Sequence, residues 1–252
     1  MKPIALITGA TSGIGEACAR KFARGGYDII ITGRKQEALN RLAEQIKGIG
    51  ADVLTLLFDV RDAKAARAAI DSIPQQWRAI DVLINNAGLA LGLDKEHEGD
   101  MEDWDIMIDT NIKGLLTMTR YVVPDMVERG CGHVINIGSV AGDAAYAKGA
   151  VYCATKSAVK TITDGLRIDL ADTPVRVTNI KPGLVETNFS VTRFHGDKQR
   201  AENVYKGITP LTGADIADVA YYAASAPKHV QIAEVLVLAT HQASGSVIYR
   251  EG

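Results

Sequence analysis

Three side chains near the middle of this 252-residue sequence have types and spacings that suit acid–base chemistry. Ser139 follows an apolar run from 133 to 137 that predicts a buried strand, so it stands at a strand's carboxyl end, where open α/β sheets bind ligands. Tyr152 and Lys156 are four residues apart and would share one face of a helix. An ammonium group one turn away favours the phenolate, which lowers the pKa of a tyrosine from about 10 toward neutrality. We therefore expect Tyr152 to act as a general acid, with Ser139 hydrogen-bonding to the same carbonyl oxygen.

A glycine-rich segment near the N-terminus has a pattern typical of cofactor binding. The apolar run from 4 to 8 predicts a strand, and a helical pattern follows the segment from 9 to 15. Glycines at such a turn let the backbone approach a pyrophosphate, and the helix N-terminus supplies amide donors. The alternative is a plain strand–helix connector, but the strand–turn–helix context favours a cofactor site. The residues expected to contact the cofactor here are Gly9, Thr11, Ser12, Gly13, Ile14 and Gly15.

The end of the second predicted strand, residues 28–32, indicates which cofactor is bound. A dinucleotide site for NAD places a carboxylate here, which accepts hydrogen bonds from the ribose 2′-hydroxyl. This sequence instead has Gly33, Arg34 and Lys35. The arginine fork can bind a 2′-phosphate, and cations at the start of a helix are otherwise unfavourable. Arg34 and Lys35 therefore predict NADP(H).

These motifs together resemble those of the short-chain dehydrogenase/reductase family. Ser139, Tyr152 and Lys156 match the family's catalytic signature, and Thr8 to Gly15 match its T-G-x-x-x-G-x-G cofactor motif. The resemblance covers almost the whole chain. It implies reversible hydride transfer between nicotinamide C4 and a carbonyl or alcohol carbon. In that reaction Tyr152 gives or takes the hydroxyl proton, and Lys156 lowers its pKa and holds the nicotinamide ribose.

The resemblance also implies further cofactor contacts. In the family, the segment around Asp59 lies beside the adenine, the Asn-Asn-Ala-Gly element lies against the cofactor, and the Pro-Gly turn lies under the nicotinamide. The threonine after that turn reaches the carboxamide or the pyrophosphate. The matching residues here are Asp59, Val60, Asn86, Ala87, Gly88, Pro182, Gly183, Val185 and Thr187.

Asn111 lies in the apolar stripe of a long helical pattern from 102 to 129, which we expect Pro124 to disturb. A buried amide among apolar neighbours needs hydrogen-bond partners, so a purely structural role is one explanation. In the family the matching asparagine also holds a water that links the active-site lysine to solvent. Asn111 is therefore counted as a fourth catalytic residue.

The order of patterns predicts the fold class. Strand and helix patterns alternate along the chain, which favours an α/β fold with a single Rossmann-type, doubly wound parallel sheet and helices on both faces. The family's version has about seven strands. We expect one domain over 1–252, with 1–90 forming mainly the cofactor-binding half. Residues 188–210 are irregular and charged, as in a mobile substrate lid, and 240–252 form a C-terminal arm.

Composition and charge exclude several classes of protein. A net charge of −2 gives no electrostatic reason to expect nucleic acid, and no apolar run approaches the ~20 residues of a membrane span. Three cysteines without C-x-x-C spacing favour a reducing compartment, and the N-terminus lacks a signal-peptide pattern. Five histidines have no metal-ligand spacing, so no metal is expected. We expect a cytoplasmic protein that binds neither nucleic acid nor membrane.

Several longer segments resemble those of the family's NADP-dependent 3-hydroxy acid dehydrogenases. They are residues 85–92, 102–104, 107–111, 126–130 and 136–139. Those enzymes act on serine-like 3-hydroxy acids, reduce malonic semialdehyde and are homotetramers. Sulfoacetaldehyde reductases of the same family are also similar, and these segments do not separate the two. A non-catalytic NADP(H) sensor with this fold is the other alternative, but it should have lost part of the Ser–Tyr–Lys set.

The expected substrate is a small anion, which needs a cation in the pocket. Arg193 lies in the predicted lid, six residues after Thr187, and its fork suits a carboxylate or sulfonate. A solvated lid arginine is the alternative. Gln242, Tyr249 and Arg250 in the C-terminal arm are rival candidates.

Overall fold

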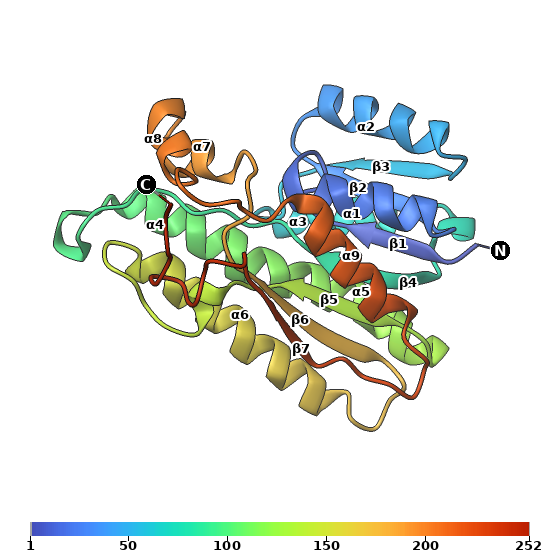
Figure 1. The fold of residues 1–252 in the computed structure, drawn as a ribbon. Helices are drawn as coiled ribbons and strands as arrows, with labels where there is room; N and C mark the ends of the chain where they lie inside the picture. Colours follow the sequence, from blue (N-terminus) through green and yellow to red (C-terminus); the bar gives the residue numbers. More distant parts are fainter. Residues whose placement is uncertain (1, 252) are drawn as a thin grey trace.

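The computed structural model describes residues 2–251, so positions 1 and 252 of the expected domain lie outside the described residues. Within that range seven parallel strands form one sheet in the order β3-β2-β1-β4-β5-β6-β7, and helices lie on both faces (Figure 1). The predicted fold class is therefore confirmed. The strands are β1 (Ile4–Ile7), β2 (Asp28–Gly33), β3 (Val53–Leu57), β4 (Ile80–Asn85), β5 (His133–Ile137), β6 (Arg176–Pro182) and β7 (Glu234–Val237).

The helices follow the strands in regular alternation. The longer ones are α1 (Gly13–Arg24), α2 (Gln36–Gly48), α3 (Ala63–Asp71), α4 (Met101–Ile108), α5 (Leu115–Arg129), α6 (Ala150–Asp169) and α9 (Gly213–Ser225). Two short helices, α7 (Phe189–Arg193) and α8 (Lys198–Asn203), occupy the segment expected to form a lid. Short 3₁₀ turns are η1 (Gln75–Trp77), η2 (Glu96–Glu98) and η4 (Val140–Gly142), and η3 (Asp109–Gly114) is a π-helical turn.

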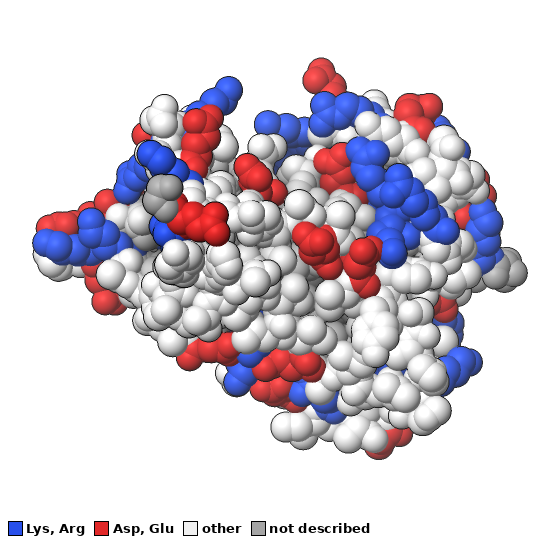
Figure 2. Space-filling model, viewed as in Figure 1, with Lys and Arg blue, Asp and Glu red and all other residues white. Residues whose placement is uncertain are grey.

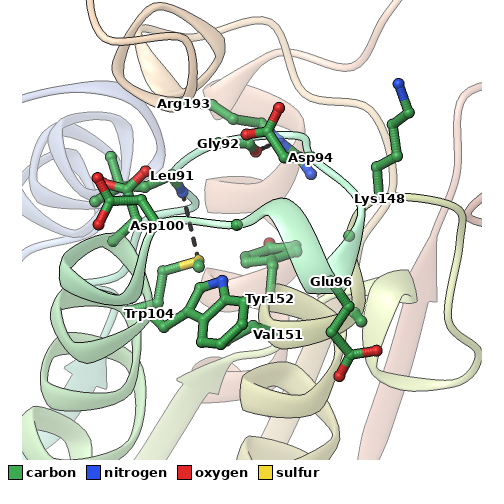
Figure 3. A pocket seen from close by; sticks show the side chains of 15 residues that line it. Leu91, Gly92, Asp94, Glu96, Asp100, Trp104, Lys148, Val151, Tyr152 and Arg193 are labelled. Atoms are coloured by element: carbon green, nitrogen blue, oxygen red, sulfur yellow. Dashed lines mark hydrogen bonds between the residues drawn. The ribbon is translucent and has the colours of Figure 1, made fainter.

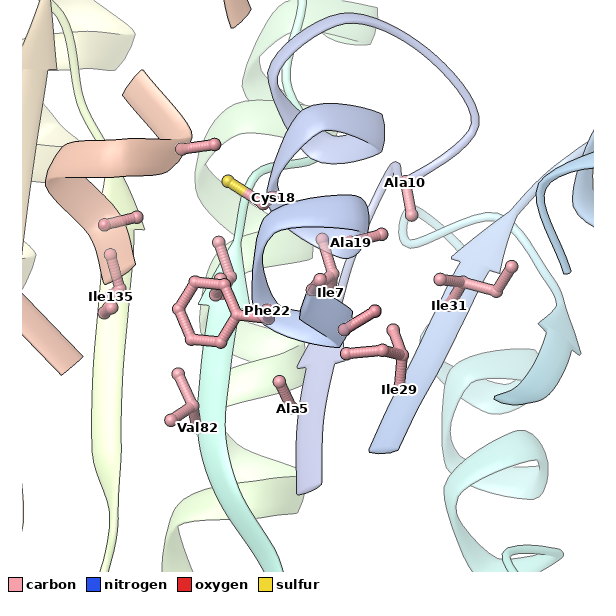
Figure 4. Packing of buried hydrophobic residues seen from close by; sticks show 14 of the residues in the cluster. Ala5, Ile7, Ala10, Cys18, Ala19, Phe22, Ile29, Ile31, Val82 and Ile135 are labelled. Atoms are coloured by element: carbon pink, nitrogen blue, oxygen red, sulfur yellow. The ribbon is translucent and has the colours of Figure 1, made fainter. Parts of the chain in front are cut away.

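Alternate residues of the central strand β1 supply two separate cores. Ala5 and Ile7 pack with residues of α1, α2 and α9 on one face of the sheet. Ile4 and Leu6 pack with residues of α3 and α5 on the other face. Figure 4 shows the first core, in which Phe22 of α1 lies among side chains of the central strands. Because both faces are covered, the strands are continuous apolar runs, which is why the sequence identifies them.

The strand order places a crevice at the middle of the sheet. The chain runs from β1 through β2 to β3 at one edge, then returns to β4 beside β1 and continues to β7 at the other edge. The direction of winding therefore reverses between β1 and β4. In open parallel sheets ligands bind at the carboxyl ends of the strands at this reversal.

The helical stretch from 102 to 129 is interrupted, but not where expected. Pro124 lies inside α5, where it removes one backbone donor without ending the helix. The irregularity is the π-helical turn from 109 to 114, which carries the buried Asn111. Turns of this kind are rare and often lie at functional sites.

The arm after β7 folds back onto the chain. Gln242 and Ile248 form an antiparallel bridge, and the Glu251 amide donates to the Gly207 carbonyl at the end of the lid segment.

No helix in residues 2–251 is both long enough and apolar enough to cross a membrane. The main group of basic side chains on the face in Figure 2 lies over α1. Two of them are ion-paired there, Arg20 with Glu16 and Lys21 with Asp218.

Candidate active site

A cavity of about 510 Å³ opens at the carboxyl ends of the strands, where the fold predicts a ligand. It is lined by most of the residues predicted to bind cofactor or substrate: Gly9, Thr11, Ser12, Gly13, Ile14, Arg34, Asp59, Val60, Asn86, Ala87, Gly88, Ser139, Tyr152, Lys156, Pro182, Gly183, Val185, Thr187 and Arg193. Three predicted residues, Gly15, Lys35 and Asn111, do not line it. The structure thus brings together residues from Gly9 to Gly245, which are 236 positions apart in the sequence.

The glycine turn has the geometry that its sequence requires. Gly9 and Gly13 have positive φ angles of 61° and 57°, which only glycine adopts readily. Gly15 instead allows close packing, since a Cβ there would lie 2.4 Å from the Asn86 amide nitrogen. That amide donates to the carbonyls of Thr8 and Gly9 and so joins the end of β4 to the turn. The N-terminus of α1 begins at Gly13 without a side-chain cap, which leaves its amide groups for an anion.

Arg34 and Lys35 differ in their position relative to the cavity. Arg34 lines the cavity, and its Nη1 lies 3.6 Å from Oδ2 of Asp59. Lys35 is the exposed N-cap residue of α2 and lies outside the cavity lining. At the preceding position, a Cβ on Gly33 would lie 2.7 Å from the Thr11 methyl carbon, so there is no room for a side chain. The carboxylate typical of NAD sites is therefore sterically excluded from position 33.

Two further observations show that this end of the cavity suits a polar ligand. The hydroxyl oxygens of Thr32 and Thr110 are buried and have no hydrogen-bond partner among residues 2–251, and both residues line the cavity. Burial opposes ionisation of Asp59, but hydrogen bonds from Arg61, together with the charges of Arg61 and Arg34, hold its pKa below the usual value. Unpaired buried hydroxyls and open helix amides fit a dinucleotide that carries phosphates and ribose hydroxyls.

Ser139, Tyr152 and Lys156 meet where β5, η4 and α6 converge. Ser139 comes two residues after β5 and caps η4, with its Oγ accepting from the Ala141 amide at 3.1 Å. Tyr152 and Lys156 lie in the first two turns of α6 and are more than nine-tenths buried. The Lys156 ammonium donates to the Ile137 carbonyl at 2.8 Å. All three line the cavity, so the expected grouping exists.

The pKa of Tyr152 differs from the value expected from the sequence. Burial lowers the pKa of Lys156 to about 8. Burial, together with the neighbouring Tyr146, raises the pKa of Tyr152 above its usual value, and the Ser139 hydroxyl and Arg193 only partly oppose this. The expectation that Lys156 brings the Tyr152 pKa toward neutrality is therefore wrong for this structure, because burial is the largest influence on that pKa and Lys156 is not among the groups that lower it. Tyr152 is a neutral phenol at pH 7 and can donate a proton.

Asn111 is held entirely by protein groups. Its Oδ1 accepts from the Leu89 amide at 2.9 Å, and its Nδ2 donates to the Leu89 carbonyl at 2.8 Å and to Thr155 Oγ1 at 3.0 Å. Thr155 in turn donates to the Tyr152 carbonyl at 2.7 Å. Asn111 thus joins the loop after β4 to the helix that carries Tyr152.

Arg193 of α7 extends from the lid toward Tyr152. Its Cζ lies 5.7 Å from the centre of the Tyr152 ring, and its Nη1 donates to the Tyr146 hydroxyl at 2.8 Å. The other lid contact to Tyr152 is the edge of the Phe189 ring, with 5.7 Å between ring centres. Sequence reasoning missed Tyr146, whose only signal was its place between Ser139 and Tyr152.

The rival residues in the C-terminal arm have other partners. Gln242 reaches the cavity, but its Oε1 accepts from the Leu184 amide and its Nε2 donates to the Ser244 carbonyl. Arg250 donates to the carbonyls of Val204 and Lys206, and Tyr249 is 66% exposed. Of the four candidates for the anion, Arg193 is the cation placed beside Tyr152.

Comparisons with known proteins agree with this arrangement. NADP-dependent 3-hydroxy acid dehydrogenase YdfG of Salmonella typhi is 49% identical over 98% of this chain and 99% of its own. Sulfoacetaldehyde reductase 2 of Chromohalobacter salexigens is 45% identical over 96% of each chain. A solved closed form of serine dehydrogenase complexed with NADP+ matches 99% of this chain and 100% of its own, with a TM-score of 0.92 and 44% identity. A family model described as short chain dehydrogenase matches residues 3–198. The chain therefore belongs to the short-chain dehydrogenase family.

Proposed function

We propose that this protein is an NADP(H)-dependent oxidoreductase that interconverts a short 3-hydroxy acid and its 3-oxo acid or semialdehyde. The observation that carries the proposal is the placement of the Arg193 guanidinium carbon 5.7 Å from the centre of the Tyr152 ring, with both residues lining the same cavity. A proton donor and an anion-binding group at this distance suit a substrate whose carbonyl and acidic group are separated by few bonds. The names of the relatives, which include 3-hydroxy acid and serine dehydrogenases, support the same substrate class.

The cofactor would bind along the crevice between β1 and β4. The glycine turn and the N-terminus of α1 would hold the pyrophosphate, and Arg34 would hold the 2′-phosphate. Asp59 and Val60 would lie at the adenine. Nearer Tyr152, the cavity residues Asn86, Ala87, Gly88, Pro182, Gly183, Val185 and Thr187 would form the nicotinamide side. When bound, NADPH supplies the hydride. Lys35 lies outside the cavity and would add only positive charge near the phosphate.

Ser139 and Tyr152 would act on the substrate oxygen. Ser139 Oγ already accepts a hydrogen bond from the Ala141 amide, so its own proton is free for the substrate carbonyl. Tyr152 would donate its phenolic proton to that oxygen during reduction, because burial keeps the phenol protonated. Lys156 would hold the nicotinamide ribose and assist proton movement, and Asn111 would keep the helix that carries Tyr152 in place. These roles follow the family pattern and the positions of the four side chains.

We also propose a homotetramer in the cytoplasm. Large apolar side chains that are exposed on the single chain support assembly, among them Tyr222 of α9 and Leu236 of the edge strand β7. The three cysteines are unpaired, as in a reducing compartment. Light scattering during size exclusion tests the tetramer, and cell fractionation tests the compartment.

Turnover of a small panel of aldehydes tests the proposed reaction. NADPH consumption is measured with malonic semialdehyde, with sulfoacetaldehyde and with the neutral methyl ester of malonic semialdehyde. We expect the highest kcat/KM with malonic semialdehyde. A higher value with sulfoacetaldehyde would instead identify a sulfoacetaldehyde reductase, and NADPH binding without turnover of any aldehyde would support the sensor alternative.

A further inference from the structure

We propose that Tyr146 is a specificity-determining residue of this site, because its hydroxyl holds the Arg193 guanidinium where it can bind the anionic group of a short aldehyde. The proposal rests on the proposed function and deepens it, since it says how the enzyme distinguishes charged from neutral substrates. Tyr146 is not one of the Ser–Tyr–Lys set. It lies in the loop between η4 and α6, seven positions after Ser139.

Arg193 is fixed by two contacts from different parts of the chain. Its Nε donates to the Gly92 carbonyl at 3.1 Å, and the Gly92 amide donates back to the Arg193 carbonyl at 3.0 Å. Its Nη1 donates to the Tyr146 hydroxyl at 2.8 Å, and its Cζ lies 5.4 Å from the centre of the Tyr146 ring. Figure 3 shows Arg193 and Gly92 on one side of a small pocket, with Tyr152 below them. Gly92 therefore holds the Nε side of the guanidinium, and Tyr146 is the side chain that holds its terminal Nη1.

The guanidinium retains capacity for an anion. Arginine carries five N–H donors, and the two contacts use one at Nε and one at Nη1, so three remain. In the part of the chain that the structure describes, Arg193 forms no ion pair, although Asp94 lines the same small pocket. A partly buried cation without a counter-charge is unfavourable until an anion binds it. Arg193 lines the same cavity as Ser139 and Tyr152.

Tyr146 itself is held firmly. A Cβ on Gly149 would lie 2.0 Å from its ring, so the ring packs directly on that glycine and has little room to move. Burial raises the pKa of Tyr146, and Arg193 only partly opposes this, so the hydroxyl remains neutral and does not neutralise the guanidinium. A neutral oxygen can therefore orient the cation while leaving its charge for the substrate. A phenylalanine at this position would keep the ring packing and lose the hydrogen bond.

The test compares Tyr146→Phe with Arg193→Ala, Arg193→Lys and the double variant Tyr146→Phe/Arg193→Ala. The substrates are malonic semialdehyde, sulfoacetaldehyde and the neutral methyl ester of malonic semialdehyde. Tyr146→Phe should raise KM for an anionic aldehyde about tenfold, while kcat and the KM for the ester change less than about twofold. Comparing the carboxylate and sulfonate shows which anion the site prefers. Tyr121→Phe, which removes a hydroxyl that donates to the Ala63 carbonyl outside both pockets, is the matched control and should leave all values unchanged.

The double variant separates positioning from simple packing. If Tyr146 acts through Arg193, Tyr146→Phe adds no further rise in KM to that of Arg193→Ala. Arg193→Lys keeps the charge without the fork, so it should raise the KM for the anionic aldehydes while sparing the ester. The proposal is overturned if Tyr146→Phe affects charged and neutral substrates equally, or if its effect multiplies with that of Arg193→Ala.

A binding measurement separates this inference from the proposed reaction. The NADP+-loaded enzyme is titrated with propanoate and with ethanesulfonate, which carry the anion but cannot react. Wild-type protein should bind one of them about tenfold more tightly than Tyr146→Phe, even if no aldehyde in the panel is turned over. Absence of binding to the wild-type protein overturns the inference, whereas binding without turnover counts against the proposed reaction alone. Thermal unfolding of each variant confirms that it is folded.

Discussion

Burial determines the protonation of the two titratable groups at the centre of the site. Tyr152 and Lys156 are both enclosed, so each favours its neutral form more than it would in water. For Tyr152 this keeps the proton that reduction consumes. For Lys156 it lowers the pKa to about 8, so the ammonium is close to losing its charge under physiological conditions.

Tyr152→Phe removes the proton donor alone. We expect kcat to fall by roughly 10²–10⁴-fold, which is the usual contribution of a positioned general acid, while the affinity for NADPH stays within about twofold. Steady-state kinetics and NADPH fluorescence titration measure the two quantities. Retention of more than about a tenth of the wild-type kcat would show that the proton comes from another group.

Lys156 should make stability depend on pH in a defined direction. Its pKa of about 8 in the folded protein lies below the value of about 10.4 in an unfolded chain, so the unfolded chain binds more protons between these pH values. The free energy of unfolding of the cofactor-free protein should therefore gain a favourable contribution as pH rises from 8 toward 10. Relative to Lys156→Met, wild type should gain about 1.6 kcal/mol between pH 8 and 9.5. Urea unfolding at the two pH values measures this, and equal differences at both would exclude a lowered pKa.

We expect the close approach of Thr11 to position 33 to influence the choice of cofactor together with Arg34. Because a Cβ there would lie 2.7 Å from the Thr11 methyl carbon, Gly33→Asp alone should weaken NADPH and NADH alike. Gly33→Asp combined with Thr11→Ser, which removes that methyl, and with Arg34→Ala should favour NADH. We expect NADPH affinity to fall by about 100-fold and NADH affinity to rise, as measured by fluorescence titration. If Gly33→Asp alone already favours NADH, the methyl group is not the obstacle.

At the scale of elements, the sequence predicted the strands and helices whose residue pattern lies within one short segment of the chain. The apolar runs that became β1, β4 and β5 were found because strands covered on both faces contain few polar residues. The π-helical turn at Asn111 was missed, because the apolar residues on both sides of it were interpreted as one continuous helical pattern. The raised pKa of Tyr152 and the contact between Tyr146 and Arg193 were also missed. Both depend on segments that meet only in the folded protein.

A buried ion-pair group joins three elements beneath the site. The Lys181 ammonium at the end of β6 lies 2.9 Å from both oxygens of Asp143, just after η4, and 2.6 Å from Glu234 of β7. Burial disfavours its charge, but Glu234 and Asp143 together raise its pKa above the usual value. The group ties the turn that Ser139 caps to the strand that leads into Pro182.

Lys181→Met should leave two carboxylates without their shared cation. We expect a loss of roughly 3 kcal/mol in the free energy of unfolding, the lower end of the range for a broken buried pair, because Asp143 and Glu234 are partly exposed. The triple variant Lys181→Met/Asp143→Asn/Glu234→Gln should regain most of that stability. Urea unfolding measures both proteins. Equal stability of the single and triple variants would show that charge pairing at Lys181 is unimportant.

At the scale of the whole molecule, the C-terminal arm connects the turn after β6 with the end of the lid segment. Gln242 accepts from the Leu184 amide beside Gly183, and its Oε1 approaches Gly183 so closely that a Cβ there would lie 2.2 Å away. Further along, Arg250 donates to the carbonyls of Val204 and Lys206, at the C-terminal end of the lid segment. The arm thus links the turn after β6 to residues 204–206.

Arg250→Ala should therefore loosen the lid without removing any group that faces the substrate. A lid formed by residues 188–210 would cover charged and neutral substrates alike, so KM should rise by a similar factor, about three- to tenfold, for malonic semialdehyde and for its methyl ester. Arg193→Ala should differ, since its effect falls on the charged aldehyde. Arg41→Ala, on the outer surface of α2, serves as the arginine control and should change neither KM. A rise confined to the charged aldehyde would make Arg250 the anion-binding residue and would reassign that role from the lid to the arm.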